Sequence, residues 1–192
     1  PGIDCKMISE VVPSVSLSDL IYVGRLIEHK NIDLLIRAVK HVQSEIPDLK
    51  VMIVGDGPEI DNLRLLAREL DLSQSISFLG FVEDYNYALS LMKSSRIFVS
   101  PSTREGFGMA ALEANACGIP VVTVNHDMNA VMDLISKDTG LICQPDEDDL
   151  SRAILTLLLG QSINKERCIE AAKEYDWDAI CNRAERVYDQ TT

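Results

Sequence analysis

Short apolar runs alternate with longer amphipathic stretches along most of this chain. Six apolar runs, most of them followed by a glycine or another turn residue, lie at residues 20–23, 51–54, 76–79, 96–99, 121–124 and 140–143. Between these runs, apolar side chains recur three or four positions apart, which is the spacing of helices that bury one face. The pattern therefore predicts six short buried strands that alternate with helices.

Proline residues mark several of the predicted helix boundaries. Pro47 stops the helical pattern that begins near residue 31, and Pro58 suits the first turn of the following helix. One helix is expected to begin near Met109, and the others are expected at residues 31–46, 59–70, 85–93, 148–159, 163–173 and 177–188.

Buried strands that alternate with helices indicate an α/β fold. We predict a Rossmann-like, doubly wound, six-stranded parallel sheet that is covered by helices on both faces. Right-handed crossovers favour the strand order 3-2-1-4-5-6, in which a ligand crevice opens at the carboxyl ends of strands one and four. A length of 192 residues suits one such domain. We place it at residues 20–175, after a lead-in at 1–19 and before a C-terminal helix at 176–192.

The stretch at residues 100–118, SPSTREGFGMAALEANACG, has the most distinctive chemistry in the chain. A strand leads through Gly106 and Gly108 into a helix that is expected to bury Met109, Leu112 and Ala116 on one face. The first N–H groups of a helix have no partner within the helix and lie at its positive end. This turn is therefore suited to an anionic ligand.

Charged side chains flank the same predicted crevice. Glu105 and Glu113 are eight positions apart, and a carboxylate beside a phosphate would repel it, so we expect both to accept hydrogen bonds from hydroxyl groups. Arg25 follows strand one and Lys30 precedes the first long helix, where each could bind phosphate oxygens. Phosphate together with hydroxyl groups indicates a nucleotide or a nucleotide sugar.

Composition excludes several other classes of protein. The net charge of −12 argues against a nucleic-acid-binding face, which needs clustered Lys and Arg. Five dispersed cysteines without a C-x-x-C pair are typical of free thiols in a reducing compartment, so we expect a cytoplasmic protein. No apolar run approaches the roughly 18 residues of a membrane span, and no signal peptide is visible.

The sequence does not suggest a metal site. His29, His41 and His126 are scattered, without the spacing of metal ligands. Two D-x-D sequences, at residues 146–148 and 176–178, stand at predicted helix starts, where acidic side chains cap the helix. We therefore expect them to be caps and not a metal pair.

A dinucleotide-binding enzyme is an alternative that the pattern favours less. Residues 106–111 match the fingerprint G-x-G-x-x-A. That fingerprint belongs after the first strand, with an acidic residue at the end of the second. Here it follows the fourth strand, and the fifth strand ends at Asn125.

Together these residues resemble the C-terminal domain of retaining glycosyltransferases of the GT-B architecture, which have two facing Rossmann-like domains, and specifically glycosyltransferase family 4 (group 1). Glu105 and Glu113 fit the E-x7-E motif of that family. The other matching segments are Gly2-Ile3-Asp4, Val23-Gly24-Arg25-Leu26 with Lys30, Val54-Gly55-Asp56-Gly57-Pro58, Phe78-Leu79-Gly80-Phe81-Val82, Pro101-Ser102, Gly106-Phe107-Gly108, Glu113-Ala114, Gly118-Ile119-Pro120-Val121 and Trp177.

The resemblance implies transfer of a sugar from a nucleoside diphosphate sugar with retained anomeric configuration. It implies no obligatory metal and no other cofactor. Arg25 and Lys30, beside Gly24, would hold the diphosphate and stabilise the leaving group as negative charge builds on it. Glu113 would accept from the ribose hydroxyls.

The remaining donor contacts implied by the resemblance involve the backbone as well as one side chain. Glu105, which we count with the two cations as catalytic, would hold the donor sugar. The N–H groups of Gly106, Phe107, Gly108 and Met109 would assist it. The backbone of Gly80, Phe81 and Val82 would line the base.

Two residues depart from the pattern of the family. Asn31 stands where a glycine usually follows the lysine, and asparagine tolerates the left-handed conformation, so the turn is expected to survive. Asn115 stands where an apolar residue is usual, and we expect this to weaken one packing contact.

The family's N-terminal domain, which carries the acceptor site, does not occur in this sequence, and the chain opens on Pro1. We therefore expect the donor-binding half of a hexosyltransferase-like enzyme, inactive alone, with that domain as its partner. An acceptor at a membrane surface would be held through the missing domain. A sugar-nucleotide epimerase of the same architecture and a non-catalytic nucleotide-binding module are the alternatives. The sequence leaves the base, the sugar and the acceptor open.

Overall fold

The computed structural model describes residues 1–160 and 163–189. Six parallel strands form one sheet in the order β3-β2-β1-β4-β5-β6, which confirms the predicted topology. The strands are β1 (Ser18–Val23), β2 (Val51–Val54), β3 (Ile76–Gly80), β4 (Ser95–Ser100), β5 (Val121–Val124) and β6 (Gly140–Cys143). β1 pairs with β4, with Leu20 opposite Ile97, so the strand order reverses between these two strands.

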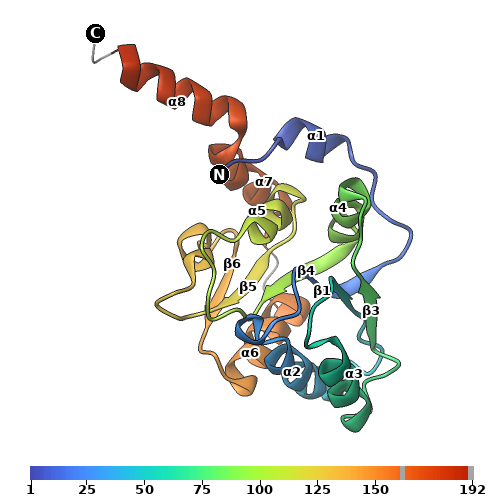
Figure 1. The fold of residues 1–192 in the computed structure, drawn as a ribbon. Coiled ribbons are helices and arrows are strands. Elements are labelled where there is room, and N and C mark those ends of the chain that lie inside the picture. The colour runs from blue at the N-terminus through green and yellow to red at the C-terminus, as the bar shows by residue number, and fades with distance from the viewer. Residues whose placement is uncertain (161–162, 190–192) are drawn as a thin grey trace.

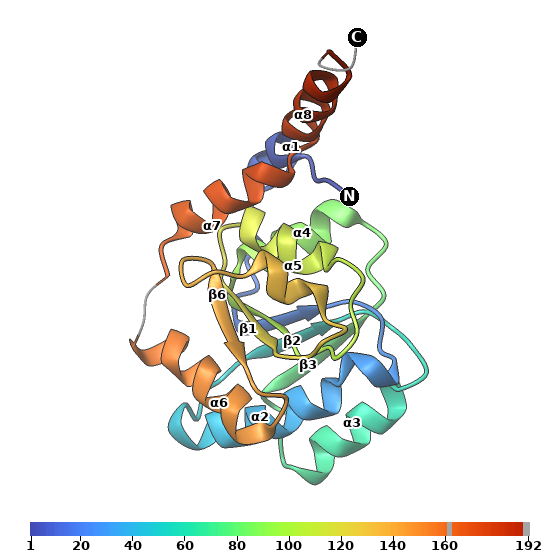
Figure 2. The ribbon, with the colours of Figure 1, turned by 90° about the vertical axis from the view of Figure 1, so that its left-hand side faces the viewer.

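Helices cover both faces of the sheet (Figure 1). One face carries α2 (Ile32–Glu45), α3 (Ile60–Glu69) and α6 (Glu147–Leu155). The other face carries α1 (Cys5–Glu10), α4 (Tyr85–Lys93), α5 (Met109–Ala116) and α7 (Lys165–Ala172). The last helix, α8 (Trp177–Asp189), projects away from the body of the domain (Figure 2).

The central strands are buried on both faces, and this explains their continuous apolar sequence. In β1, Leu20 and Tyr22 pack into the core on the α2 side, whereas Ile21 packs into the core on the α5 side. Each of these three side chains is at most 2% exposed. The alternation along one strand therefore supplies two separate cores.

The predicted lead-in has more structure than expected. It contains α1, which begins where the Asp4 carboxylate accepts from the Met7 N–H at 2.8 Å, and Ile8 is fully buried. Ile3 forms a β-bridge with Asp176, so the two ends of the domain are joined. β1 also begins at Ser18, two residues before the predicted boundary. Residues 190–192 of the predicted C-terminal segment lie outside the described residues.

Two helices differ in detail from the expectation. The helix predicted at 148–159 is present, but α6 ends at Leu155 and a π-helical turn, Thr156–Gly160, continues it. The hydroxyl of Thr156 donates to the Arg152 carbonyl at 2.7 Å, and such bonding back to the preceding turn bends helices. In α5, nearly every side is buried instead of one face, because its alanines fit between the sheet and the neighbouring helices. Met109 is only partly buried.

Asn115 also behaves differently from the expectation. Its side chain is 2% exposed and donates to the carbonyls of Ile119 and Thr139, each at 3.1 Å. The amide therefore ties the end of α5 to the approach to β6, and it does not merely weaken a packing contact.

Two further findings concern the composition. All five cysteines are free, with Cys117, Cys143 and Cys168 buried. Among the described residues, no helix combines the length and the apolar character needed to cross a bilayer.

Candidate functional site

The loop after β1 forms one wall of the predicted crevice. The Tyr22 hydroxyl is buried at the end of β1 and donates to the Arg25 carbonyl at 3.0 Å. Burial raises the pKa of Tyr22, and the nearby carboxylate of Glu105 raises it further. The Gly24 N–H donates to the Val54 carbonyl at 3.0 Å. These bonds fix the backbone of the loop, while the Arg25 side chain is exposed.

The turn before α2 connects this wall to the loop after β4. Lys30 ends a 3₁₀ turn, Glu28–Lys30, and Asn31 adopts the left-handed conformation with φ 49°, as expected for asparagine at this position. The Asn31 amide donates to the Pro101 carbonyl and to the Thr103 hydroxyl, each at 3.2 Å. A glycine at position 31 would adopt the same backbone conformation without these two bonds.

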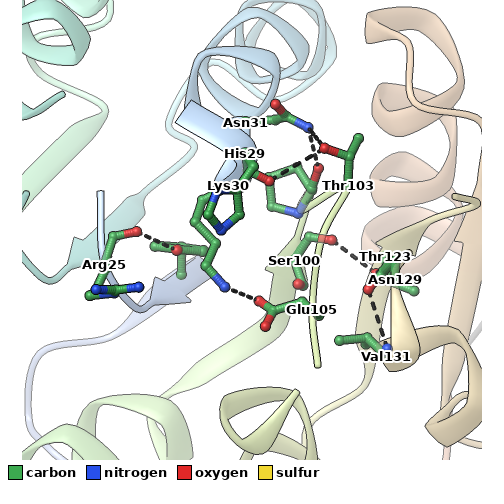
Figure 3. A network of polar contacts seen from close by, with 12 residues as sticks. Arg25, His29, Lys30, Asn31, Ser100, Thr103, Glu105, Thr123, Asn129 and Val131 are labelled. Carbon is green, nitrogen blue, oxygen red and sulfur yellow. Dashed lines mark hydrogen bonds and ion pairs between the residues drawn. The ribbon is translucent and has the colours of Figure 1, made fainter. Parts of the chain in front are cut away.

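Lys30 and Glu105 form an ion pair across the crevice (Figure 3). Their side chains are only 14% and 20% exposed. The sequence predicted that both residues lie at the same crevice, and the structure brings them together. It also adds a contact that the sequence did not predict, because the ammonium and the carboxylate bind each other.

A cavity of about 340 Å³ opens beside this pair, and we call it the loop cavity. Its lining includes Tyr22, Val23, Gly24, Lys30, Ser100, Glu105, Phe107, Gly108, Met109 and Ala110. No side chain caps the N-terminus of α5, which therefore presents its first N–H groups at this cavity. The turn that the sequence singled out therefore lies at the loop cavity.

Gly108 is needed for that geometry. It caps α5 with φ 90°, in the left-handed region, and a Cβ built there would overlap the side chain of Val131. The ring of Phe107 packs edge-to-face on Tyr175, with centroids 5.7 Å apart. The turn is therefore held by packing on both sides of the glycine.

A second cavity, of about 540 Å³, adjoins the first, and we call it the apolar cavity. Its lining is Val23, Gly24, Arg25, Val54, Gly55, Asp56, Phe81, Val82 and Ala88. The two cavities share Val23 and Gly24. Arg25 and Lys30 therefore lie at adjoining cavities and not in a single one.

Glu113 lies on the side of α5 that faces α4. Its carboxylate accepts from the Tyr85 hydroxyl at 2.8 Å. Burial raises the pKa of Glu113, and the hydrogen bond from Tyr85 lowers it by a smaller amount. Glu113, Gly80 and Gly106 are not among the residues that line the two cavities. The structure therefore does not bring these three into direct contact with the loop cavity.

The acidic sequences at 146–148 and 176–178 are caps, as predicted. The Asp146 carboxylate accepts from the Asp149 N–H at 2.8 Å, and the Asp176 carboxylate accepts from the N–H groups of Asp178 and Cys5, each at 2.9 Å. Within residues 1–160 and 163–189, no group of three His, Cys, Asp or Glu side chains is arranged to hold a metal ion.

A buried polar cluster beneath the loop cavity was not predicted from the sequence. Asn129, Thr123 and Ser100 come from three different segments and are joined by hydrogen bonds. The only signal in the sequence was Asn129 itself, since asparagine often stands just before the first turn of a helix. The sequence around Asn129 did not indicate that its side-chain amide would form hydrogen bonds with β5.

Comparisons with known proteins identify the family of the chain. The family model described as Glycosyl transferases group 1 matches residues 14–175. The gpi3 subunit of phosphatidylinositol N-acetylglucosaminyltransferase from Schizosaccharomyces pombe is 29% identical over 174 residues, which cover 88% of this chain and 38% of that protein. The chain thus spans about two fifths of the length of the curated relatives that it matches first.

Two solved structures share the fold. The Anabaena protein HepE in complex with UDP has a TM-score of 0.82 at 22% identity, covering 98% of this chain and 56% of that one. The C-terminal domain of a group 1 glycosyl transferase, LpcC, from Francisella tularensis has a TM-score of 0.70 at 22% identity, covering 95% of this chain and 98% of that one. The family match over most of the chain shows that this protein belongs to the glycosyl transferases group 1 family.

Proposed function

We propose that this chain is the donor-binding, C-terminal half of a retaining GT-B glycosyltransferase of family 4. The observation that carries the proposal is the loop cavity, where a cation, a carboxylate and the uncapped N-terminus of α5 converge. Such a site suits a diphosphate joined to a hydroxyl-bearing group. The UDP complex of HepE and the extent of the match to the Francisella tularensis domain support the same assignment.

In this proposal, different residues of the site bind different parts of the donor. Lys30 and the N–H groups at the start of α5 bind the diphosphate, and Arg25 reaches it from the adjoining cavity. The apolar cavity, with Phe81 and Val82, accommodates the base. Glu105 accepts from the sugar hydroxyls, and Glu113 accepts from the ribose.

The same groups would stabilise the departing nucleoside diphosphate. Negative charge develops on the leaving diphosphate as the glycosidic bond breaks, and fixed cations and helix N–H groups lower the free energy of that charge. We propose that Lys30, Arg25 and α5 suffice for this without a metal ion. The acceptor, at a membrane surface in this proposal, is held by an N-terminal domain, so the present chain is inactive alone. The name of the Schizosaccharomyces pombe relative, which includes phosphatidylinositol, supports a lipid acceptor.

A titration of this chain with UDP, GDP, ADP and NAD, followed by calorimetry, tests the proposal. We expect saturable binding of one nucleoside diphosphate with a dissociation constant on the order of 0.1–1 mM, which is about −4 to −5.5 kcal/mol. Arg25→Ala should weaken this binding at least fivefold. Arg68→Ala, which removes an exposed cation on α3, should not.

Three outcomes would contradict the proposal. Preference for NAD would indicate an oxidoreductase. Turnover of a nucleotide sugar by this chain alone would show that no further domain is needed. Equal loss of binding in the Arg25→Ala and Arg68→Ala variants would mean that net charge, and not the loop after β1, holds the ligand.

A further inference from the structure

One buried amide lies beneath the loop cavity and makes three hydrogen bonds. Asn129 is 2% exposed and stands just before the 3₁₀ turn Ala130–Leu134. Its Nδ2 donates to the Thr123 hydroxyl at 3.0 Å and to the Val124 carbonyl at 2.7 Å, and its Oδ1 accepts from the Val131 N–H at 3.2 Å. The amide orientation is therefore determined, because both donors find acceptors on β5.

This cluster reaches the point where the loop after β4 begins. The hydroxyl of Thr123 accepts from Asn129 and donates to the carbonyl of Ser100 at 2.9 Å. Ser100 is the last residue of β4 and lines the loop cavity. The start of the loop is thus tied to Asn129 through one buried hydroxyl (Figure 3).

The backbone on either side of Asn129 holds Glu105. The Glu105 N–H donates to the Met128 carbonyl at 2.9 Å, and the Ala130 N–H donates to the Glu105 carbonyl at 3.0 Å. These bonds form a short parallel bridge between Glu105 and Asn129. Val131, whose N–H is bound by the Asn129 side chain, packs against Gly108 at the start of α5.

We propose that Asn129 is the positioning residue that directs the Glu105 carboxylate to Lys30 and the loop cavity. The inference rests on the proposed function for the role of that carboxylate, and on the contacts above for its placement. Without the amide, the segment that carries Met128 and Ala130 loses two hydrogen bonds to β5, and the backbone that holds Glu105 becomes less fixed. A displacement of about 1 Å is enough to impair a catalytic group.

Asn115 provides a matched control. It is also a 2% exposed asparagine, and it donates to two carbonyls, but these lie between α5 and β6 and not on the loop after β4. Asn129→Ala and Asn115→Ala should therefore lower the melting temperature by similar amounts. In Asn129→Ala alone, hydrogen exchange of the Glu105 and Ala130 amides should become at least tenfold faster. Equal exchange in both variants would overturn the proposed placement.

The second measurement asks whether the placement affects the donor. We define a sugar increment as the dissociation constant of a nucleoside diphosphate divided by that of its sugar conjugate, using UDP with UDP-glucose and UDP-N-acetylglucosamine, and GDP with GDP-mannose. Asn129→Ala should reduce the increment about as much as Glu105→Gln does, and the double variant should reduce it no further. Asn115→Ala should leave it within twofold of the original chain.

The outcomes separate the two proposals. A full additional reduction in the double variant would show that Asn129 does not act through Glu105. Failure of the original chain to bind any of these nucleotides would count against the proposed function of this chain. The hydrogen-exchange comparison would still decide whether Asn129 holds Glu105.

Discussion

Removal of the Glu105 charge should have opposite effects on diphosphate binding and on stability. Glu105 and Lys30 pair across the crevice with side chains that are 20% and 14% exposed. A diphosphate that binds Lys30 must compete with this carboxylate and also lies near its negative charge. In Glu105→Gln the ammonium is released and the repulsion is lost, so bare UDP or GDP should bind more tightly.

The size of the effect follows from the burial of the pair. Exposed ion pairs contribute about 0–1 kcal/mol, whereas breaking a buried pair costs about 3–5 kcal/mol. The Lys30–Glu105 pair lies between these limits. We expect diphosphate affinity to rise about tenfold, or about 1.4 kcal/mol. The free energy of unfolding should fall by about 2 kcal/mol, which lowers the melting temperature by about 4–8 °C.

Calorimetric titration with UDP and GDP, together with thermal unfolding, measures both effects. Glu28→Gln is the matched control, because Glu28 is an exposed carboxylate two residues before Lys30 and does not pair with it. That variant should bind the diphosphate within twofold of the original chain. Weaker diphosphate binding in Glu105→Gln would refute the reasoning, since it would mean that the carboxylate contacts the diphosphate favourably.

Four further predictions concern other residues of the site. Gly108→Ala should lower the free energy of unfolding by about 2 kcal/mol, because it places a Cβ at φ 90° against Val131. Adding Val131→Ala should recover part of this loss in urea titrations. If the double variant recovers nothing, the overlap with Val131 is not the cause. Asn31→Gly should lower the free energy of unfolding by about 1 kcal/mol, because two hydrogen bonds are lost. Asn31→Ala should lower it by about 1 kcal/mol more, because alanine disfavours the left-handed backbone at this position. Equal free energies of unfolding for the two variants would contradict this prediction. Burial raises the pKa of Glu113, so its ionisation opposes folding as pH rises. Glu113→Gln should therefore raise the melting temperature at pH 7, and the difference in melting temperature between the variant and the original chain should disappear below the usual pKa of 4.5. A difference that does not change with pH would contradict the assigned burial. Glu113→Ala should weaken binding of ribonucleotides more than of 2′-deoxy analogues, and equal losses would remove its proposed ribose role.

The sequence by itself determined the layers, the strand order and the position of the crevice. Hydrophobic periodicity reports whether each stretch is buried on one face or on two, and right-handed crossovers leave few arrangements of six such strands. The order then places Gly24 and Gly108 at the same cavity, as predicted. The left-handed turn at Asn31 was also predictable, because asparagine tolerates that conformation.

Only the tertiary structure decided which side chains meet within the site. Lys30 and Glu105 are 75 positions apart, and the Tyr85 hydroxyl reaches Glu113 across 28 positions. A local pattern shows that a residue is buried or charged, but it carries no information about the atom opposite. For the same reason the pattern predicted only a lead-in where α1 lies, and it did not reveal the amides of Asn115 and Asn129 as buried anchors. Their partners lie on segments that only the folded chain brings within hydrogen-bonding distance.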